Sequence, residues 1–170
     1  MGTLLIAEKS KAAEAIAEAL GSISKEKVSK YVYIYRVKKR DLYVVPLRGH
    51  IKGYKNTKPY QKWTARDPRE IITNPKAIFK MSSKYAGPYI KALKKYAKVC
   101  DLCVIGTDAD VQACNILLND ALPYVKKENP RIEVKQMWLG DLQKSTIRKQ
   151  FNQLVAPKWS WAYCGEARAK

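Results

Sequence analysis

Three acidic residues occupy positions at which an α/β protein could hold a metal ion. Glu8 follows an apolar run near the start of the chain, and Asp108 and Asp110 follow a second apolar run at 102–105. Sites in open α/β sheets form at the carboxyl ends of strands. Carboxylates crowded at such an end repel one another unless a hard cation such as Mg²⁺ joins them. An Asp-x-Asp pair is also common in turns and helix caps, so the third acid after another strand is what favours a metal site.

The strands and helices that would position these acids alternate along the chain. Residues 3–7 have the composition of a buried strand, and apolar residues then recur at helical spacing from Ser10, the expected N-cap, to Gly21, where the helix should end. The later elements expected, in order, are a hairpin over 31–37 and 42–47, a helix over 88–99, a strand over 102–105, a helix over 111–122, a strand over 131–138 and a helix capped by Asp141. Residues from about 50 to 80 are expected to be irregular. The alternation predicts an α/β fold with a mainly parallel central sheet that helices flank.

Positive charge is concentrated in one part of the chain. The net charge is +18, and residues 22–99 contain 21 Lys or Arg but only 4 Asp or Glu. The aromatic residues interleaved with these charges are Tyr31, Tyr33, Tyr35, Tyr43, Tyr54, Tyr60, Trp63, Tyr85, Tyr89 and Tyr96. Basic side chains neutralise phosphates and aromatic faces stack on unpaired bases, so the pattern favours DNA or RNA, with single strands preferred if the tyrosines stack. The alternative is the lysine-rich surface of heat-adapted proteins, but that surface would carry Glu in comparable numbers.

The cysteines and the apolar runs indicate the cellular setting. Cys100 and Cys103 have C-x-x-C spacing, but no second pair completes a zinc site. Strand alternation is expected to send the two thiols to opposite faces, and buried, reduced thiols are predicted. No apolar run approaches the roughly 20 residues that span a bilayer, and the chain opens directly on a strand-like run. A cytoplasmic protein without a membrane partner is therefore expected, associated with the nucleoid if DNA is its partner.

Six short motifs follow one another along the chain. They are Leu-Ile-Ala-Glu-Lys-Ser at 5–10, Gly-His-Ile at 49–51, Tyr-Gln-Lys-Trp at 60–63 with Asp-Pro at 67–68, Thr-Asp-Ala-Asp at 107–110, the strand and helix over 138–151, and Glu-Ala-Arg at 166–168. In this order they resemble the Toprim domain of type IA DNA topoisomerases, of the topoisomerase I and III kind found in archaea. The resemblance spans almost the whole chain.

That resemblance implies one Toprim α/β domain over 1–170, with a basic hairpin and loop insertion at about 22–99. It implies that Glu8, Asp108 and Asp110 hold Mg²⁺ beside DNA, and that Glu8 and Lys9 are catalytic because they lie near the scissile phosphate. The residues expected to contact nucleic acid are Lys9, Arg48, His50, Lys52 and Arg168. For His50, a structural role in the loop is an equal alternative.

The chain also departs from the family pattern. The family follows its Asp-x-Asp with Arg-Glu-Gly-Glu, whereas residues 111–114 here are Val-Gln-Ala-Cys. Gln112 replaces a carboxylate, so weak Mg²⁺ binding is expected. The family's nucleophilic tyrosine lies in another domain, and none of the eleven tyrosines here matches it, so the chain alone is not expected to relax DNA.

Three functions remain open. The first is the Toprim part of a type IA topoisomerase-like enzyme, with further domains in cis or a partner in trans. The second is a stand-alone, catalytically inactive DNA-binding module, and the third is a small Toprim nuclease, which the loss of an acid at Gln112 disfavours. The end of the chain inside a motif that continues in the family favours the first.

Overall fold

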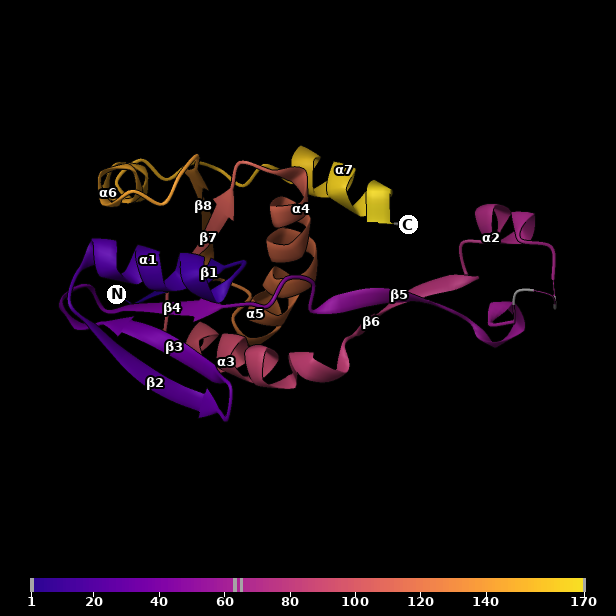
Figure 1. Cartoon of the computed structure of the whole chain (residues 1–170), viewed down its shortest axis with the longest axis horizontal. Helices are drawn as coiled ribbons and strands as arrows, with labels where there is room; N and C mark the ends of the chain where they lie inside the picture. The colour runs from indigo at the N-terminus through magenta and orange to yellow at the C-terminus, as the bar shows by residue number, and fades with distance from the viewer. Residues whose placement is uncertain (1, 63, 65, 170) are drawn as a thin grey trace.

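A six-stranded sheet forms the centre of the fold, in the order β2-β3-β4-β1-β7-β8 (Figure 1). Its parallel strands are β4 (Leu42–Pro46), β1 (Thr3–Ala7), β7 (Leu102–Asp108) and β8 (Glu133–Leu139). The antiparallel strands β2 (Ile23–Ser29) and β3 (Val32–Val37) extend the sheet beside β4. The computed structural model describes residues 2–62, 64 and 66–169. The prediction of an α/β fold with a mainly parallel sheet, flanking helices and a β-hairpin insertion is confirmed.

Helices cover both faces of the sheet. α1 (Ser10–Leu20) and α6 (Lys144–Phe151) pack on one face, and α3 (Gly87–Ala97) and α7 (Trp159–Ala169) lie on the other. A long helix beside α7 runs from α4 (Val111–Cys114) through a π-helical segment, η4 (Asn115–Ala121), to α5 (Leu122–Glu128). Short 3₁₀ turns lie at Lys38–Arg40, Lys58–Tyr60 and Lys84–Ala86. Each helix in the described part of the chain is too short or too polar to cross a lipid bilayer.

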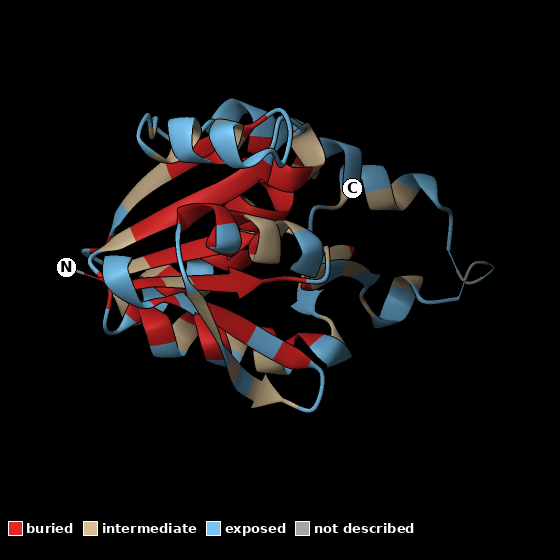
Figure 2. Cartoon of the chain, turned by 60° about the vertical axis from the view of Figure 1, so that its left-hand side comes forward, coloured by how far each residue is buried: buried red, intermediate tan, exposed pale blue. Residues whose placement is uncertain are grey.

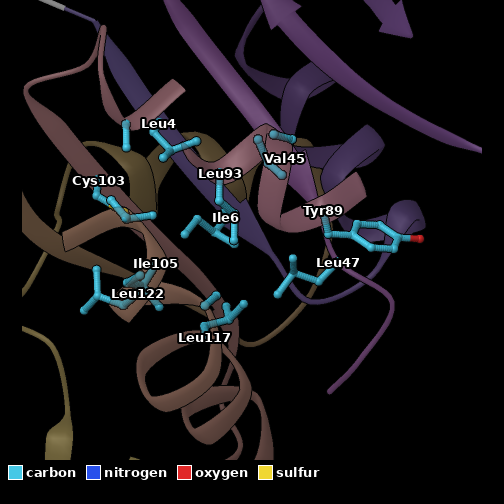
Figure 3. Packing of buried hydrophobic residues seen from close by; sticks show 14 of the residues in the cluster. Leu4, Ile6, Val45, Leu47, Tyr89, Leu93, Cys103, Ile105, Leu117 and Leu122 are labelled. Atoms are coloured by element: carbon cyan, nitrogen blue, oxygen red, sulfur yellow. The ribbon is translucent and has the colours of Figure 1, made fainter. Parts of the chain in front are cut away.

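Strand β1 is buried from both sides, which is typical of a central parallel strand. Leu4 and Ile6 belong to the apolar cluster under α3 and the long helix, and Leu5 and Ala7 to the cluster under α1 and α6. Figure 3 shows Ile6 surrounded by side chains of the first cluster, and Figure 2 shows the buried residues concentrated in the sheet and the inner sides of the helices. The sheet is therefore a rigid base that fixes where each strand ends.

A two-stranded arm projects from the central sheet (Figure 1). It consists of β5 (Lys52–Asn56) and β6 (Ile78–Ser82), which pair in antiparallel register, with the short helix α2 (Arg69–Thr73) between them in the chain. The prediction of irregular structure over about 50–80 is wrong for these strands. Most of their residues are exposed or half-buried, so the sequence lacks the apolar alternation that marks a strand packed on a core.

Several element ends also differ from those predicted. The N-cap residue of α1 is Lys9, one residue before Ser10, and that of α6 is Gln143, whose N–H donates to Asp141 Oδ1 over 2.8 Å. The helix predicted over 111–122 continues to Glu128 because Pro123 falls in the first turn of α5, where a missing N–H costs little. Strand β2 and helix α7 were not predicted.

The cysteines are mostly buried. Cys100 and Cys103 are buried, as predicted, and Cys114 is also buried, while Cys164 is exposed. The expectation of opposite faces is wrong, because Cys100 precedes β7 and both members of the C-x-x-C pair lie in the same apolar cluster. Burial raises the pKa of each of these two thiols to about 12. They are therefore neutral packing groups at physiological pH.

The contact between α7 and the long helix depends on Gly165. A methyl group at Gly165 would lie 2.4 Å from the Val111 carbonyl oxygen and 2.7 Å from Asn115 Cβ. We expect Gly165→Ala to lower the free energy of unfolding by roughly 1–3 kcal/mol, because the backbone must move to admit the methyl. Chemical denaturation measures this, with Gly87→Ala as the matched control, since nothing lies within 4 Å of its added methyl. Equal stability of the two variants would contradict the prediction.

Candidate functional site

The carboxyl ends of three neighbouring strands meet at one edge of the sheet. β1 lies between β4 and β7, and its last residue, Ala7, pairs with Pro46 on one side and Gly106 on the other. The chain passes from β1 to β4 on one side and later to β7 on the other, so β1 is a point at which the strand order changes direction. Ligands of open α/β sheets bind outside the strand ends at such a point.

Backbone hydrogen bonds hold the loop after β4 against the end of β1. The Leu47 N–H donates to the Ala7 carbonyl over 2.8 Å, and the Gly49 N–H donates to the Glu8 carbonyl over 3.2 Å. Gly49 has φ +71°, a conformation that glycine adopts at little cost. This turn explains the Gly-His pair and carries His50 to the carboxyl edge, beside Glu8.

Glu8 and Lys9 form an ion pair at this edge. Lys9 Nζ lies 3.2 Å from Glu8 Oε1, and the Glu8 side chain is 12% exposed against 65% for Lys9. The hydrogen bond to Glu8 raises the pKa of the Lys9 ammonium, and the charges of Asp108 and Asp110 raise it further. Lys9 therefore lies in the combined field of all three predicted acids.

Asp108 ends β7, and Asp110 begins the long helix. The Asp110 carboxylate caps α4, accepting the Gln112 N–H over 3.1 Å and the Ala113 N–H over 3.4 Å. α1 begins at the same edge, after Lys9. Both helices thus direct the positive ends of their dipoles toward the carboxyl edge, which favours an anion such as a phosphate there.

The predicted metal ligands have suitable chemistry, but they are not assembled into a cage. Carboxylate oxygens are the ligands that Mg²⁺ takes. Among the residues that the structure describes, however, there is no group of three or more Asp, Glu, His or Cys close enough together to hold an ion. Glu8 is paired with Lys9, and Asp110 is bonded to the start of its helix. Metal binding by Glu8, Asp108 and Asp110 therefore stays a prediction.

His50 contacts a fully buried carboxylate, Asp120. Its Nδ1 lies 3.1 Å from Asp120 Oδ2, and Asp120 has no solvent exposure. The hydrogen bond to Asp120 raises the pKa of His50 above its ordinary value, against the opposing effect of burial. Gln112 Oε1 is buried without a hydrogen-bond partner, and the nearby Gln112 side chain also raises the pKa of His50, by less than Asp120 does. Gln112 is thus part of the surroundings of His50.

Asp120 also holds the base of the arm. Lys80 of β6 forms ion pairs of 2.6 Å with both Asp120 and Glu166 of α7. Burial lowers the pKa of Lys80, but the two carboxylates outweigh it, so this pKa lies above its ordinary value. Tyr54 of β5 donates a hydrogen bond to Glu166, and desolvation together with this contact raises the pKa of its phenol. The arm, the long helix and α7 are joined by one charge network.

The remaining residues predicted to contact nucleic acid are distributed around this network. Arg48 is exposed, with its guanidinium 6.0 Å from the centre of the Tyr85 ring, and Arg168 is exposed on α7. Lys52 is half-buried and donates to the Asn119 carbonyl over 3.4 Å, so part of its role is to anchor the arm. Contact of any of them with DNA stays a prediction.

Sequence reasoning missed the charge network and misjudged some aromatic residues. The sequence contains one weak indication of the network, because Asp120 is an acid in the middle of an apolar helical run. Glu166 was noted only as part of the Glu-Ala-Arg motif. Tyr35, Tyr89 and Tyr96 are buried in the core and cannot stack on bases, whereas Tyr31, Tyr33 and Tyr85 are exposed. Trp63 lies outside the described residues.

Comparison with known proteins assigns the family. Residues 3–137 match the model of the Toprim domain, so this chain belongs to the Toprim domain family. It is similar to DNA topoisomerase 1 of Archaeoglobus fulgidus (29% identity over 170 residues), DNA topoisomerase 1 of Methanocaldococcus jannaschii (28% over 172) and DNA topoisomerase 3-beta of Arabidopsis thaliana (26% over 173). The matches include 97–100% of this chain but only 20–25% of each relative. The resemblance predicted from the motifs is confirmed.

The charge state of His50 tests the network directly. His50 is the only histidine, so one imidazole signal in an NMR pH titration reports its pKa. We expect Asp120→Asn to lower that pKa, because the effect of burial on the imidazole is then no longer opposed by the carboxylate. We also expect it to lower the free energy of unfolding by roughly 3 kcal/mol or more, because Lys80 and His50 lose the carboxylate they share. Asp101→Asn, an exposed acid at the opposite edge of the sheet, serves as the control.

The contribution of His50 to the free energy of unfolding depends on pH. The pKa of His50 is higher in the folded protein than in the unfolded chain, where it is about 6.5. The stability contributed by charged His50 is therefore fully present below pH 6.5. It is lost as the pH rises through the higher pKa of the folded state. An Asp120→Asn variant with an unchanged His50 titration would contradict the network.

Proposed function

We propose that this chain is a DNA-binding Toprim domain of a type IA topoisomerase-like protein and acts with further domains in cis or a partner in trans. The proposal rests mainly on the charged arm. From residue 52 to 82 the chain carries eight Lys or Arg and two Asp or Glu, and most of these residues are exposed. They lie on β5, β6 and their connection, which project from the central sheet (Figure 1). Such a projection can follow a phosphate backbone without reading base sequence. A DNA partner would place the protein at the nucleoid, in the cytoplasm.

At the carboxyl edge, Lys9 and the two helix starts supply the attraction for a phosphate. Glu8, Asp108 and Asp110 would hold Mg²⁺, which when bound supplies further positive charge beside that phosphate. Glu8 must exchange its contact with Lys9 for the ion, and Asp110 can ligate while it caps α4, because a carboxylate accepts several contacts. We propose no nucleophile within this chain, and without one it would not relax supercoiled DNA alone.

A catalytically inactive DNA-binding module is the second candidate. One observation favours it: Gln112 provides a neutral, buried oxygen near His50, where the resemblance to the family implies a carboxylate. The same difference argues against a small nuclease, which would need the complete acid set.

Salt dependence tests DNA binding. We expect the affinity for a labelled duplex to fall steeply as salt rises, because each phosphate contact releases counterions. Replacing the exposed arm residues Lys55 and Lys58 with Gln should reduce the slope of log K against log salt by about one for each phosphate that is no longer neutralised. The matched control replaces Lys127 and Arg131, exposed at the opposite edge of the sheet, with Gln. Affinity that is the same at low and high salt would refute the electrostatic basis of the proposal.

Calorimetric titration with Mg²⁺ tests the metal ligands. We expect weak binding in the wild type, and stronger binding in Gln112→Glu because the variant adds a carboxylate at the helix start. Gln61→Glu adds the same charge on the arm and should leave Mg²⁺ affinity unchanged. If Gln112→Glu binds no better than the wild type, or if Asp108→Ala binds as well, Mg²⁺ does not bind at these residues.

A further inference from the structure

A groove of about 620 Å³ lies between the arm and helix α7 and is named the arm groove here. One of its walls is apolar and belongs to the arm, where it consists of Ile71 and Ile72 of α2, Pro75, and Ile78 and Phe79 of β6. Ile72 is 86% exposed and Phe79 is 45% exposed. Isolated exposed apolar residues are common, but apolar residues that gather around one hollow mark a surface on which another molecule binds.

The other wall of the arm groove is polar, and its charges are already paired. Tyr54 of β5, Lys80 of β6 and Glu166 of α7 line it. Lys80 Nζ lies 2.6 Å from Glu166 Oε2, and Tyr54 donates a hydrogen bond to the same carboxylate. An apolar side chain that enters the groove can therefore cover this wall without leaving a buried charge unpaired, which is the costly case.

Apolar surface continues from the arm groove along one flank of α7. Trp159 and Tyr163 lie two turns and one turn before Glu166, and this spacing places all three on the same side of an α-helix. Trp159 and Tyr163 are 40% and 62% exposed, and their rings stack with centres 6.1 Å apart. A peptide segment in the groove could therefore extend onto these rings.

Positive charge surrounds the arm groove. Ile71 also lines a small hollow with Lys62 and Arg66, and Tyr54 lines another with Lys55. Both acids between residues 52 and 82 form ion pairs with arginines of the same segment. Among the residues that the structure describes, no acid pairs with four lysines of this segment, which are Lys55, Lys58, Lys62 and Lys76. The groove is thus an apolar hollow whose rim attracts negative charge.

This combination of features selects among the possible occupants of the arm groove. A second copy of the chain would bring its own net charge of +18 to a basic rim, and the two copies would repel each other. Nucleic acid could pair with the lysines, but its phosphates gain nothing from a wall of isoleucines and a proline. A protein segment that combines Asp or Glu with large apolar side chains matches both the rim and the wall.

We infer that the arm groove binds an acidic segment of a partner protein, which places large apolar side chains in the groove and its carboxylates beside the surrounding lysines. The apolar contacts supply most of the affinity, and the charge pairs orient the segment and speed its association. The inference goes beyond the proposed function, because it depends on apolar side chains of the arm that contacts with phosphates do not use. The two can therefore be tested separately.

Peptide selection tests the inference. A phage library of random peptides is selected on the wild type and counter-selected on a double variant, Ile72→Ser with Phe79→Ser, which keeps every charge of the arm. We expect the retained peptides to be richer in Asp, Glu and large apolar residues than the starting library. The most enriched peptide, synthesised with a fluorescent label, should bind the double variant about tenfold or more weakly than the wild type in anisotropy measurements.

Matched variants control for other effects of the substitutions. Ile72→Leu with Phe79→Leu keeps the apolar side chains and should retain most of the peptide affinity. Val99→Ser removes an exposed apolar residue at the opposite edge of the sheet and should bind the peptide as the wild type does. An unchanged His50 titration in the double variant shows that the base of the arm is intact. If that titration changes, Ile72→Ser alone, at the more exposed position, takes the place of the double variant.

The outcomes separate the two proposals. The inference is overturned, and DNA binding left standing, if no peptide is retained, if the retained peptides are no richer in acids than the library, or if the peptide binds the double variant as tightly as the wild type. A wild type that binds the peptide but no DNA at low salt overturns the proposed function alone. Weaker binding of DNA by the double variant would make the groove a nucleic-acid contact and overturn the inference. Self-association of the wild type that the double variant loses, measured by sedimentation, would overturn it as well.

Discussion

The burial of one carboxylate constrains much of this structure. Asp120 has no exposure, and an ionised acid in that position is costly unless charged partners surround it. Its partners come from the loop after β4, through His50, and from the arm, through Lys80, which also binds Glu166 of α7. Three segments are thereby held at one place. This charge pairing acts together with the packing of α7 on the long helix, at Ala162 and Gly165, to fix the arm and α7 relative to the sheet.

The carboxyl edge of the sheet carries both acidic and basic groups. Glu8, Asp108 and Asp110 are the acids predicted to hold a metal ion, yet Glu8 is engaged by Lys9, Asp110 caps a helix, and Gln112 adds no charge. Lys9 and the two helix starts supply positive charge at this edge that would attract a phosphate.

The arm next to this edge presents lysines and arginines, which are side chains that can pair with phosphates. The charge network links the arm to α7, so a change in either element would be felt at Asp120 and His50. The chain spans a fifth to a quarter of the DNA topoisomerases to which it is similar, which agrees with the proposal that it acts together with further domains.

Apolar periodicity in the sequence determined the central strands, most of the helices, and the position of Glu8 and Asp108 at strand ends. Short motifs determined the family. Both kinds of pattern are properties of residues that are close together in the chain, so the sequence alone was enough. The arm strands β5 and β6 were not predicted, because they pair with each other without covering an apolar face and so lack alternating apolar residues. Asp120 with His50, and Tyr54 with Glu166, are 70 and 112 residues apart, so only the folded chain could show them as partners. The same holds for the tyrosines: composition placed ten aromatic residues among the basic ones, but tertiary packing decided that Tyr35, Tyr89 and Tyr96 are core and that the exposed rings of α7 face solvent.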